Sequence, residues 1–248
     1  MPYIGQQPAP KVVTSSDLAD DVVTADKIGD TAISGFTALG AEPADTDELL
    51  ISDAGTLKRL DYSYIKGGGG LIHIKTQTIS SGVSSVEFKN GVSDVVFDST
   101  YKAYKLFVSN VKFETDGMKM HMRLSTDSGS SYLTGNYVFA GMSQDAGGTE
   151  NIYRSGSDSD IRLFGDSGSN QADEPFNIEL TFHDPASTTN HIGISFLSTG
   201  FDSSSNMCIN YGGGSNTSTT SAINAFQIRP PSGNIETGTF TLFGVANS

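Results

Sequence analysis

Few residues in this sequence stand at the spacings that catalysis requires. The sharpest enzyme-like pattern is Gly165-Asp166-Ser167-Gly168, which could surround a nucleophilic serine. Such a serine needs a histidine as general base and an aspartate that orients the histidine. The upstream histidines are His73 and His121, and each lies on the polar side of an alternating segment. We therefore interpret the tetrad as a Gly/Ser/Asp loop and predict no catalytic residues.

Two short acidic runs, Asp45–Asp47 and Asp158–Asp160, place carboxylates two residues apart, as oxygen ligands for calcium would be. An EF-hand loop needs glycine at its sixth position and glutamate at its twelfth, whereas counting from Asp45 gives Leu50 and Thr56. Zinc would need clustered ligands, but the four histidines are scattered over separate segments, at His73, His121, His183 and His191. We interpret both runs as solvated turns and predict neither a metal nor a cofactor.

The chain has one cysteine, Cys208, in the segment Asn206–Tyr211. A single cysteine cannot form an intramolecular disulfide, so stability must come from burial or from association. We interpret Cys208 as a small buried side chain on a strand rather than as a nucleophile.

The composition indicates the kind of elements that must position any site. The 248 residues include 28 Gly, 8 Pro and no Trp, and only 17% are charged, with a net charge of −13. Such a chain covers its surface with uncharged polar residues and favours many short strands joined by turns. Nucleic acid is disfavoured as a partner because clustered basic residues are lacking. After Arg162 the sequence contains one further Lys or Arg, which is Arg229.

Alternation of apolar and polar residues predicts about ten strands after residue 70. Met118, Met120, Met122 and Leu124 share one face of a segment, and the same pattern recurs in Phe176–His183. The remaining candidates are Ile72–Thr78, Val83–Lys89, Tyr101–Phe113, Asn136–Met142, Ile161–Phe164, His191–Leu197, Ala222–Arg229 and Thr237–Val245. We predict an all-β fold, an antiparallel β-sandwich (jelly-roll-like) over residues 71–248. Long recognition loops are expected at Ser143–Glu174 and Ser198–Ser221.

A run of four glycines at 67–70 predicts a hinge that divides the chain. Residues 1–40 are expected to be an extended thread, because apolar residues recur there at every fifth position, a period that fits neither helix nor strand. These apolar residues are Val13, Leu18, Val23, Ile28 and Ile33. They cannot bury one another, so we expect them to dock elsewhere; a disordered acidic arm is the alternative. Residues 41–66 predict a small β-hairpin module with its turn at Asp53-Ala54-Gly55.

Three segments resemble those of bacteriophage tail fibres and related virion appendages, particularly from marine and cyanobacterial phages. Residues 16–28, SDLADDVVTADKI, resemble the repeated anchor segments of such fibres. Residues 45–60, DTDELLISDAGTLKRL, are similar to a hairpin module of phage structural proteins. Residues 230–244, PPSGNIETGTFTLFG, look like the closing strand of a β-sandwich found at fibre tips. The resemblance implies a homotrimer fixed to the tail by its amino-terminal region, with the carboxy-terminal domain facing the host.

The resulting functional hypothesis is a non-enzymatic structural protein of the virion, a short tail fibre. Its expected partners are further copies of the chain, a tail protein such as an adaptor, nozzle or baseplate component, and a host surface glycan or protein. The amino terminus lacks the features of a signal peptide and no apolar run approaches ~18 residues, so we expect synthesis in the host cytoplasm and no membrane insertion. The alternatives are a structural component of the baseplate, nozzle or capsid decoration, and a polysaccharide-degrading spike.

If the host ligand is a glycan, aromatic faces beside polar loops are expected to bind it. The candidate receptor-binding residues are Tyr132, Tyr137, Tyr153 and Tyr211, with Arg154 as a polar contact. Ordinary packing in the core is the competing role for each of them.

Overall fold

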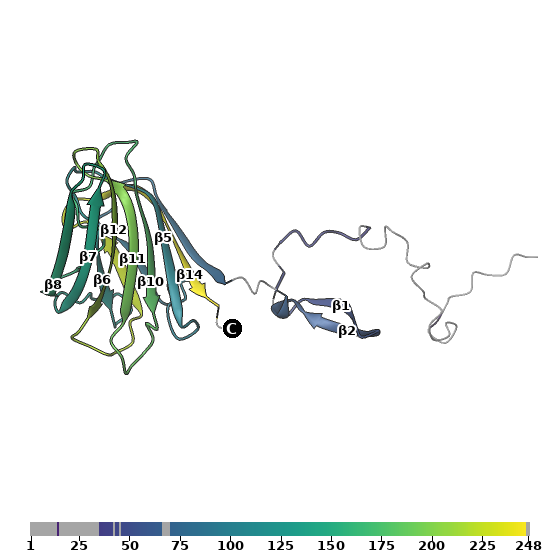
Figure 1. Ribbon diagram of the computed structural model, residues 1–248. Coiled ribbons are helices and arrows are strands. Elements are labelled where there is room, and N and C mark those ends of the chain that lie inside the picture. Colours follow the sequence, from purple (N-terminus) through teal and green to yellow (C-terminus); the bar gives the residue numbers. More distant parts are fainter. Residues whose placement is uncertain (1–13, 15–34, 42, 45, 66–69, 247–248) are drawn as a thin grey trace, which may run out of the picture. The chain divides into compact units, whose positions relative to one another are not determined.

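The computed structural model describes residue 14 and residues 35–41, 43–44, 46–65 and 70–246 of the chain (Figure 1). It divides into two compact units, residues 1–66 and 67–248. Most of the predicted thread, including Val13, Leu18, Val23, Ile28 and Ile33, lies outside the described residues, and so do residues 67–69 of the predicted hinge. In the described part of the chain, no helix is long and apolar enough to cross a membrane.

The first unit contains the predicted β-hairpin. Strand β1 (Glu48–Asp53) pairs with β2 (Thr56–Asp61) through a two-residue turn, and both turn residues have positive φ, 50° at Ala54 and 83° at Gly55. This is the backbone geometry that suits a tight hairpin, and glycine adopts it without steric cost. A short 3₁₀ turn (Tyr62–Tyr64) follows, but the side chain of Asp61 makes no capping hydrogen bond to it.

The second unit is built on an antiparallel sheet of eight strands, in the order β3-β14-β5-β10-β11-β12-β7-β8. Figure 1 shows β8, β7, β12, β11, β10, β5 and β14 side by side in this sequence. Their bounds are β3 (Leu71–Ile79), β14 (Ile235–Val245), β5 (Ala103–Phe113), β10 (Phe176–His183), β11 (Gly193–Phe201), β12 (Met207–Asn216), β7 (Tyr137–Asp145) and β8 (Glu150–Asp158). Each pairing joins strands that run in opposite directions, as expected for meanders and long-range returns.

A smaller antiparallel sheet packs against the large one. Its four strands are β4 (Val86–Lys89), β13 (Ala225–Arg229), β6 (His121–Ser125) and β9 (Ile161–Arg162), in the order β4-β13-β6-β9. Residues that alternate along the two sheets form one buried hydrophobic core. The predicted antiparallel sandwich is therefore confirmed.

Aromatic rings at the centre of this core join the two sheets. Phe182 of the large sheet and Phe226 of the small sheet lie with their ring centroids 4.5 Å apart. Phe97 meets both rings at 5.1–5.2 Å, edge to face. Such contacts stabilise a core beyond the area that they bury, so this cluster fixes how the two sheets pack.

The expectation of long recognition loops at 143–174 and 198–221 is wrong, because strands β8 and β12 and the end of β11 lie within them. Several of their glycines, among them Gly165, Gly200 and Gly212, reflect close packing rather than chain reversal. At Gly212 of β12, an added Cβ would lie 2.5 Å from the carbonyl oxygen of Ala140 and 2.8 Å from the Phe196 ring. Only glycine fits where β12 passes these neighbours, and this requirement looks like a loop signal in the sequence.

Candidate functional site

The five candidate receptor-binding residues are placed differently by the fold. Tyr137 and Tyr153 are buried, Tyr132 is half-buried, and Arg154 and Tyr211 are exposed. The last two lie on the outer face of the eight-stranded sheet, on β8 and β12. The structure therefore leaves Arg154 and Tyr211 as the accessible members of the set.

Tyr137 is a core residue that links loop and strand backbone. Its hydroxyl accepts a hydrogen bond from the Leu124 amide at 2.7 Å and donates one to the Leu133 carbonyl at 3.2 Å. Burial raises the pKa of Tyr137 to about 12. The side chain is held inside the domain and presents no surface to a ligand.

Tyr153 is also a core residue, and two glycines make room for its ring. A Cβ built at Gly141 would lie 2.5 Å from the ring, and one at Gly165 would lie 2.3 Å from it. Burial, with the nearby Asp166 carboxylate, raises the pKa of Tyr153 well above its usual value. The ring therefore fills space behind the outer face.

Tyr132 lies beside the small sheet, next to the Glu87 carboxylate. Burial, followed by this neighbouring negative charge, raises the pKa of Tyr132 well above its usual value. Its hydroxyl is buried within the domain, so it does not present a polar edge to solvent.

An apolar row crosses four neighbouring strands on the outer face of the large sheet. The pairing register places Leu197 of β11 opposite Tyr211 of β12, Tyr211 opposite Met142 of β7, and Met142 opposite Ile152 of β8. Ile152 is 69% exposed, Tyr211 46% and Leu197 44%. We call these four residues the Tyr211 patch. Aligned side chains at neighbouring register positions lie within contact distance of one another on a sheet.

The Tyr211 patch contains a shallow hollow of about 320 Å³. Its lining residues are Ala140, Gly141, Met142, Ile152, Tyr211 and Gly212. The Tyr211 hydroxyl donates to the Met142 sulfur at 3.4 Å, which restrains the ring at the border of the hollow. Arg154 pairs with Ala140, a lining residue, and so stands two register positions from the Met142–Ile152 pair on the same face of the sheet.

The chemistry of this patch suits the apolar face of a ligand. A restrained tyrosine ring beside a hollow lined by small and apolar residues can stack on the C–H face of a sugar ring or on a flat apolar group. Two further hollows, of about 260 and 230 Å³, lie around Glu179 and Leu197 on strands β10, β11 and β5. Together the three hollows follow the outer face across several strands, which is the form of surface that an extended ligand requires.

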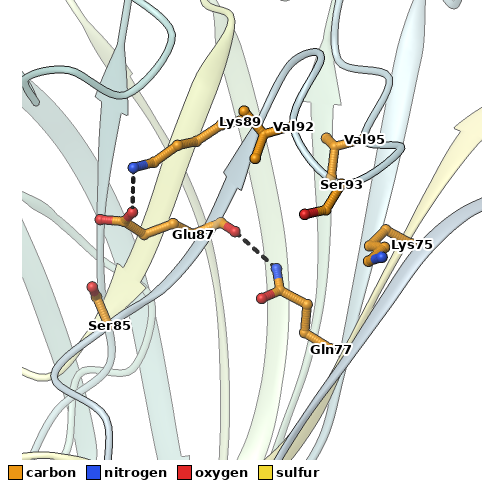
Figure 2. Close-up of a pocket in the computed structure, with 8 residues that line it drawn as sticks. All are labelled: Lys75, Gln77, Ser85, Glu87, Lys89, Val92, Ser93 and Val95. Atoms are coloured by element: carbon orange, nitrogen blue, oxygen red, sulfur yellow. Dashed lines mark hydrogen bonds and ion pairs between the residues drawn. The ribbon is translucent and has the colours of Figure 1, made fainter.

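A further hollow, which we call the edge cleft, was not predicted from the sequence. It has a volume of about 540 Å³ and is lined by Lys75, Gln77, Ser85, Glu87, Lys89, Val92, Ser93 and Val95. Figure 2 shows these side chains, which come from β3, from β4 and from the segments that flank β4. The sequence of β3 carries one signal of this cleft. Apolar Ile72 and Ile74 alternate along the first half of the strand, and polar Lys75 and Gln77 then take the inward positions opposite Leu242 and Phe240.

Asp160, predicted to lie in a solvated acidic turn, is instead 5% exposed and surrounded by cations. Arg123 Nε lies 2.9 Å and Arg229 Nη1 3.1 Å from Asp160 Oδ1, and the Ser159 hydroxyl donates to Oδ2 at 2.6 Å. Burial alone would raise the pKa of this carboxyl, but the nearby His121 ring and the bonds from Ser159 and Arg123 hold the pKa well below its usual range. This cluster ties β6 and β13 to the segment before β9.

The other chemistry-bearing residues of the sequence are engaged in local contacts. Asp166 of the Gly165–Gly168 tetrad accepts hydrogen bonds from Ser143 and Asn151, and the backbone carbonyl of Ser167 accepts one from Ser203. Within the described ranges, no hydrogen bond joins Ser167 to a histidine, and no three His, Cys, Asp or Glu side chains gather as a metal site would require. Cys208 is buried on β12, which confirms its interpretation as a strand residue.

In comparisons with known proteins, no family model, curated protein or solved structure matches the chain.

Proposed function

We propose that the chain is a short tail fibre of a bacteriophage, which attaches to the tail through its amino-terminal unit and binds a host surface glycan through the Tyr211 patch. The observation that carries the proposal is this patch, four apolar side chains aligned across four strands on an open sheet face. Exposed apolar patches on rigid elements mark binding surfaces more often than isolated exposed side chains do. The resemblance of residues 16–28, 45–60 and 230–244 to fibre segments supports the placement in a virion.

The first unit supports an assembly role. Leu50 and Leu57 of its hairpin are 74% and 70% exposed, and Tyr64 after the hairpin is 78% exposed. A two-stranded hairpin is marginal by itself in water, and it leaves these side chains without a core. Docking onto a tail protein or onto further copies of the chain would cover them. In the expected homotrimer, three weak sites would raise the effective affinity by ~10²–10⁴.

The hollows on the sheet face support a glycan as the ligand. The ring of Tyr211 supplies a stacking surface, and the exposed guanidinium of Arg154 supplies hydrogen-bond donors for hydroxyl groups. The additional hollows around Leu197 extend the surface along the direction in which further sugar units would lie. No catalytic step is needed for this role.

Antibody fragments that recognise the sandwich test the proposal on virus particles that carry the chain. We expect them to label the tail and to block adsorption to host cells. Labelling without any effect on adsorption would favour the alternative, a structural component of the baseplate, nozzle or capsid decoration, whose patch contacts a neighbouring protein. Failure to label intact particles, with the chain absent from purified virions, would overturn the placement in a virion.

A further inference from the structure

The edge cleft lies where an edge strand of each sheet borders the open side of the sandwich. Strand β3 ends the large sheet and β4 ends the small one, and the loop that follows β4 supplies Val92, Ser93 and Val95. Figure 2 shows Lys75 and Gln77 on one side of the cleft and Ser85, Glu87 and Lys89 on the other. The volume, about 540 Å³, is within the range of small-ligand sites.

A β-bulge directs the polar residues of β3 into this cleft. The register between β14 and β3 shifts between Leu242 and Phe243, and beyond the shift Lys75 pairs with Leu242, a fully buried residue. Lys75 therefore follows the inward face of the sheet although it carries a charge. Bulges re-aim side chains in this way, and they are over-represented next to binding sites.

Hydrogen bonds within the domain restrain the loop after β4. The Gly91 amide donates to the Val95 carbonyl at 2.9 Å, and the Asn90 side chain accepts from the Phe97 amide at 2.9 Å. Ser93 has a φ of 52°, which is uncommon for a residue with a side chain. Hydrogen bonds within the domain therefore brace the loop that carries Val92 and Ser93.

The polar groups of the cleft are only partly used within the domain. Glu87 pairs with Lys89 at 2.7 Å, and Gln77 donates one hydrogen bond to the Glu87 carbonyl at 2.8 Å. Within the residues that the structure describes, the Lys75 ammonium has no ion pair. The side-chain carbonyl of Gln77 and the hydroxyls of Ser85 and Ser93 have no hydrogen bond there. One cation without an ion pair, three hydrogen-bonding groups and the Glu87–Lys89 ion pair thus line the hollow beside an apolar wall at Val92, 51% exposed.

We propose that the edge cleft binds an acidic sugar, a uronic acid unit of an oligosaccharide. Its carboxylate pairs with the Lys75 ammonium, and its ring hydroxyls bond to Gln77, Ser85 and Ser93. The C–H face of the ring rests on Val92. A sugar acid presents a single negative charge, several hydroxyls and an apolar face together, and the cleft offers a partner for each.

Another role for Lys75 is to guard the sheet edge. Inward-pointing charged residues on edge strands prevent pairing with other chains. A guard requires only the charge, however, and gives no reason for the hydrogen-bonding groups of β4 and the following loop to face the same hollow. The binding test separates the two roles.

The test titrates the full chain with oligomers of galacturonate, glucuronate and mannuronate, and with their methyl esters, which lack the charge. We expect the acid form of at least one oligomer to bind and its ester to bind at least about 10-fold more weakly, since an ion pair to Lys75 is lost. Lys75→Gln should weaken binding of the acid by about the same factor, and Lys75→Arg should retain it. The matched control is Lys112→Gln, because Lys112 pairs with Glu236 on β14 and takes no part in the cleft.

Several outcomes would overturn the proposal. These are no binding by any acid oligomer, equal binding of acid and ester, or unchanged binding by Lys75→Gln. Inorganic sulfate and phosphate bound as tightly as the oligomer would reduce the cleft to an anion site. A folded Lys75→Gln chain that binds normally but self-associates would assign Lys75 to edge protection. The site does not rest on the fibre role: the titration uses the purified chain without virus or host cells and measures the edge cleft through Lys75, so failure of one proposal is distinguishable from failure of the other.

Discussion

The side-chain amide of Gln77 donates a hydrogen bond of 2.8 Å to the backbone carbonyl of Glu87, and this bond joins the edge strands of the two sheets. Gln77 belongs to β3 of the large sheet and Glu87 to β4 of the small sheet. Edge strands carry backbone groups that no strand pairs. The bond gives the Glu87 carbonyl a partner, and both residues line the edge cleft, so Gln77 contributes to stability and to the wall of the hollow.

Replacing Gln77 by Met keeps the size of the side chain and removes this bond. We expect the free energy of unfolding to fall by about 1 kcal/mol, the usual contribution of one hydrogen bond with a partly buried partner. Urea unfolding of the full chain measures the change. Thr78→Val is the control on the exposed face of the same strand, and a Gln77→Met variant as stable as this control would show that the bond contributes nothing.

Asp160→Asn removes the negative charge at the centre of a buried cationic cluster. Arg123 and Arg229 would then lie beside a neutral amide, and we expect the free energy of unfolding to fall by roughly 3 kcal/mol. The exposed Asp116 provides the control, since Asp116→Asn should change stability by less than about 0.5 kcal/mol. Equal stability of the two variants in chemical denaturation would contradict a stabilising role for the cluster.

Asp127 makes stability depend on acid pH. Hydrogen bonds from the hydroxyls of Ser125 and Ser131 lower the pKa of Asp127 to about 2 in the folded chain. The unfolded value is about 4, so the stabilisation is complete above pH ~4 and is lost as the pH falls toward 2. Wild type should therefore be more stable than Asp127→Asn at pH 6, and the difference should shrink between pH 4 and 2. A difference that stays constant over this range would exclude titration of Asp127 as its source.

Cys208 should be unreactive in the folded protein. Burial, with the negative charges of Asp166, Asp202 and Asp145, raises the pKa of its thiol to about 12. Only the thiolate reacts quickly with disulfide reagents, and at pH 8 the folded chain holds almost none. We expect slow labelling that accelerates at least about 100-fold in denaturing urea. Fast labelling without denaturant would mean that β12 opens locally.

Much of the fold was predictable from local pattern. The alternation in Met118–Leu124 and Phe176–His183 identified inward side chains correctly, because Met120, Leu124 and Phe182 are fully buried. Strand β8 was missed, and only the first half of β12 was recognised as a strand, because the glycines in the second half of β12 satisfy tertiary packing, which local propensity does not include. Positions 141 and 212 require glycine because a Cβ there would collide with the rings of Tyr153 and Phe196, residues distant from them in the sequence.

The candidate sites depend on relationships that no local pattern contains. Tyr211 was among the predicted binding residues, but its neighbours Met142, Ile152 and Leu197 come from three other strands and are aligned by register. Lys75 appears in the sequence as one more residue of a strand, and only the bulge opposite Leu242 turns it toward the edge cleft. Pairing register over long distances in the chain therefore decides both sites.

Competition for adsorption tests the central claim, host binding through the Tyr211 patch, most directly. Host cells are saturated with the purified full chain, and the adsorption rate of virus particles that carry it is then measured. Wild-type chain should slow adsorption at least about 10-fold, whereas Tyr211→Ala, a surface change that leaves the core intact, should not. Equal competition by wild type and Tyr211→Ala, or no competition by either at saturating concentration, would contradict this claim.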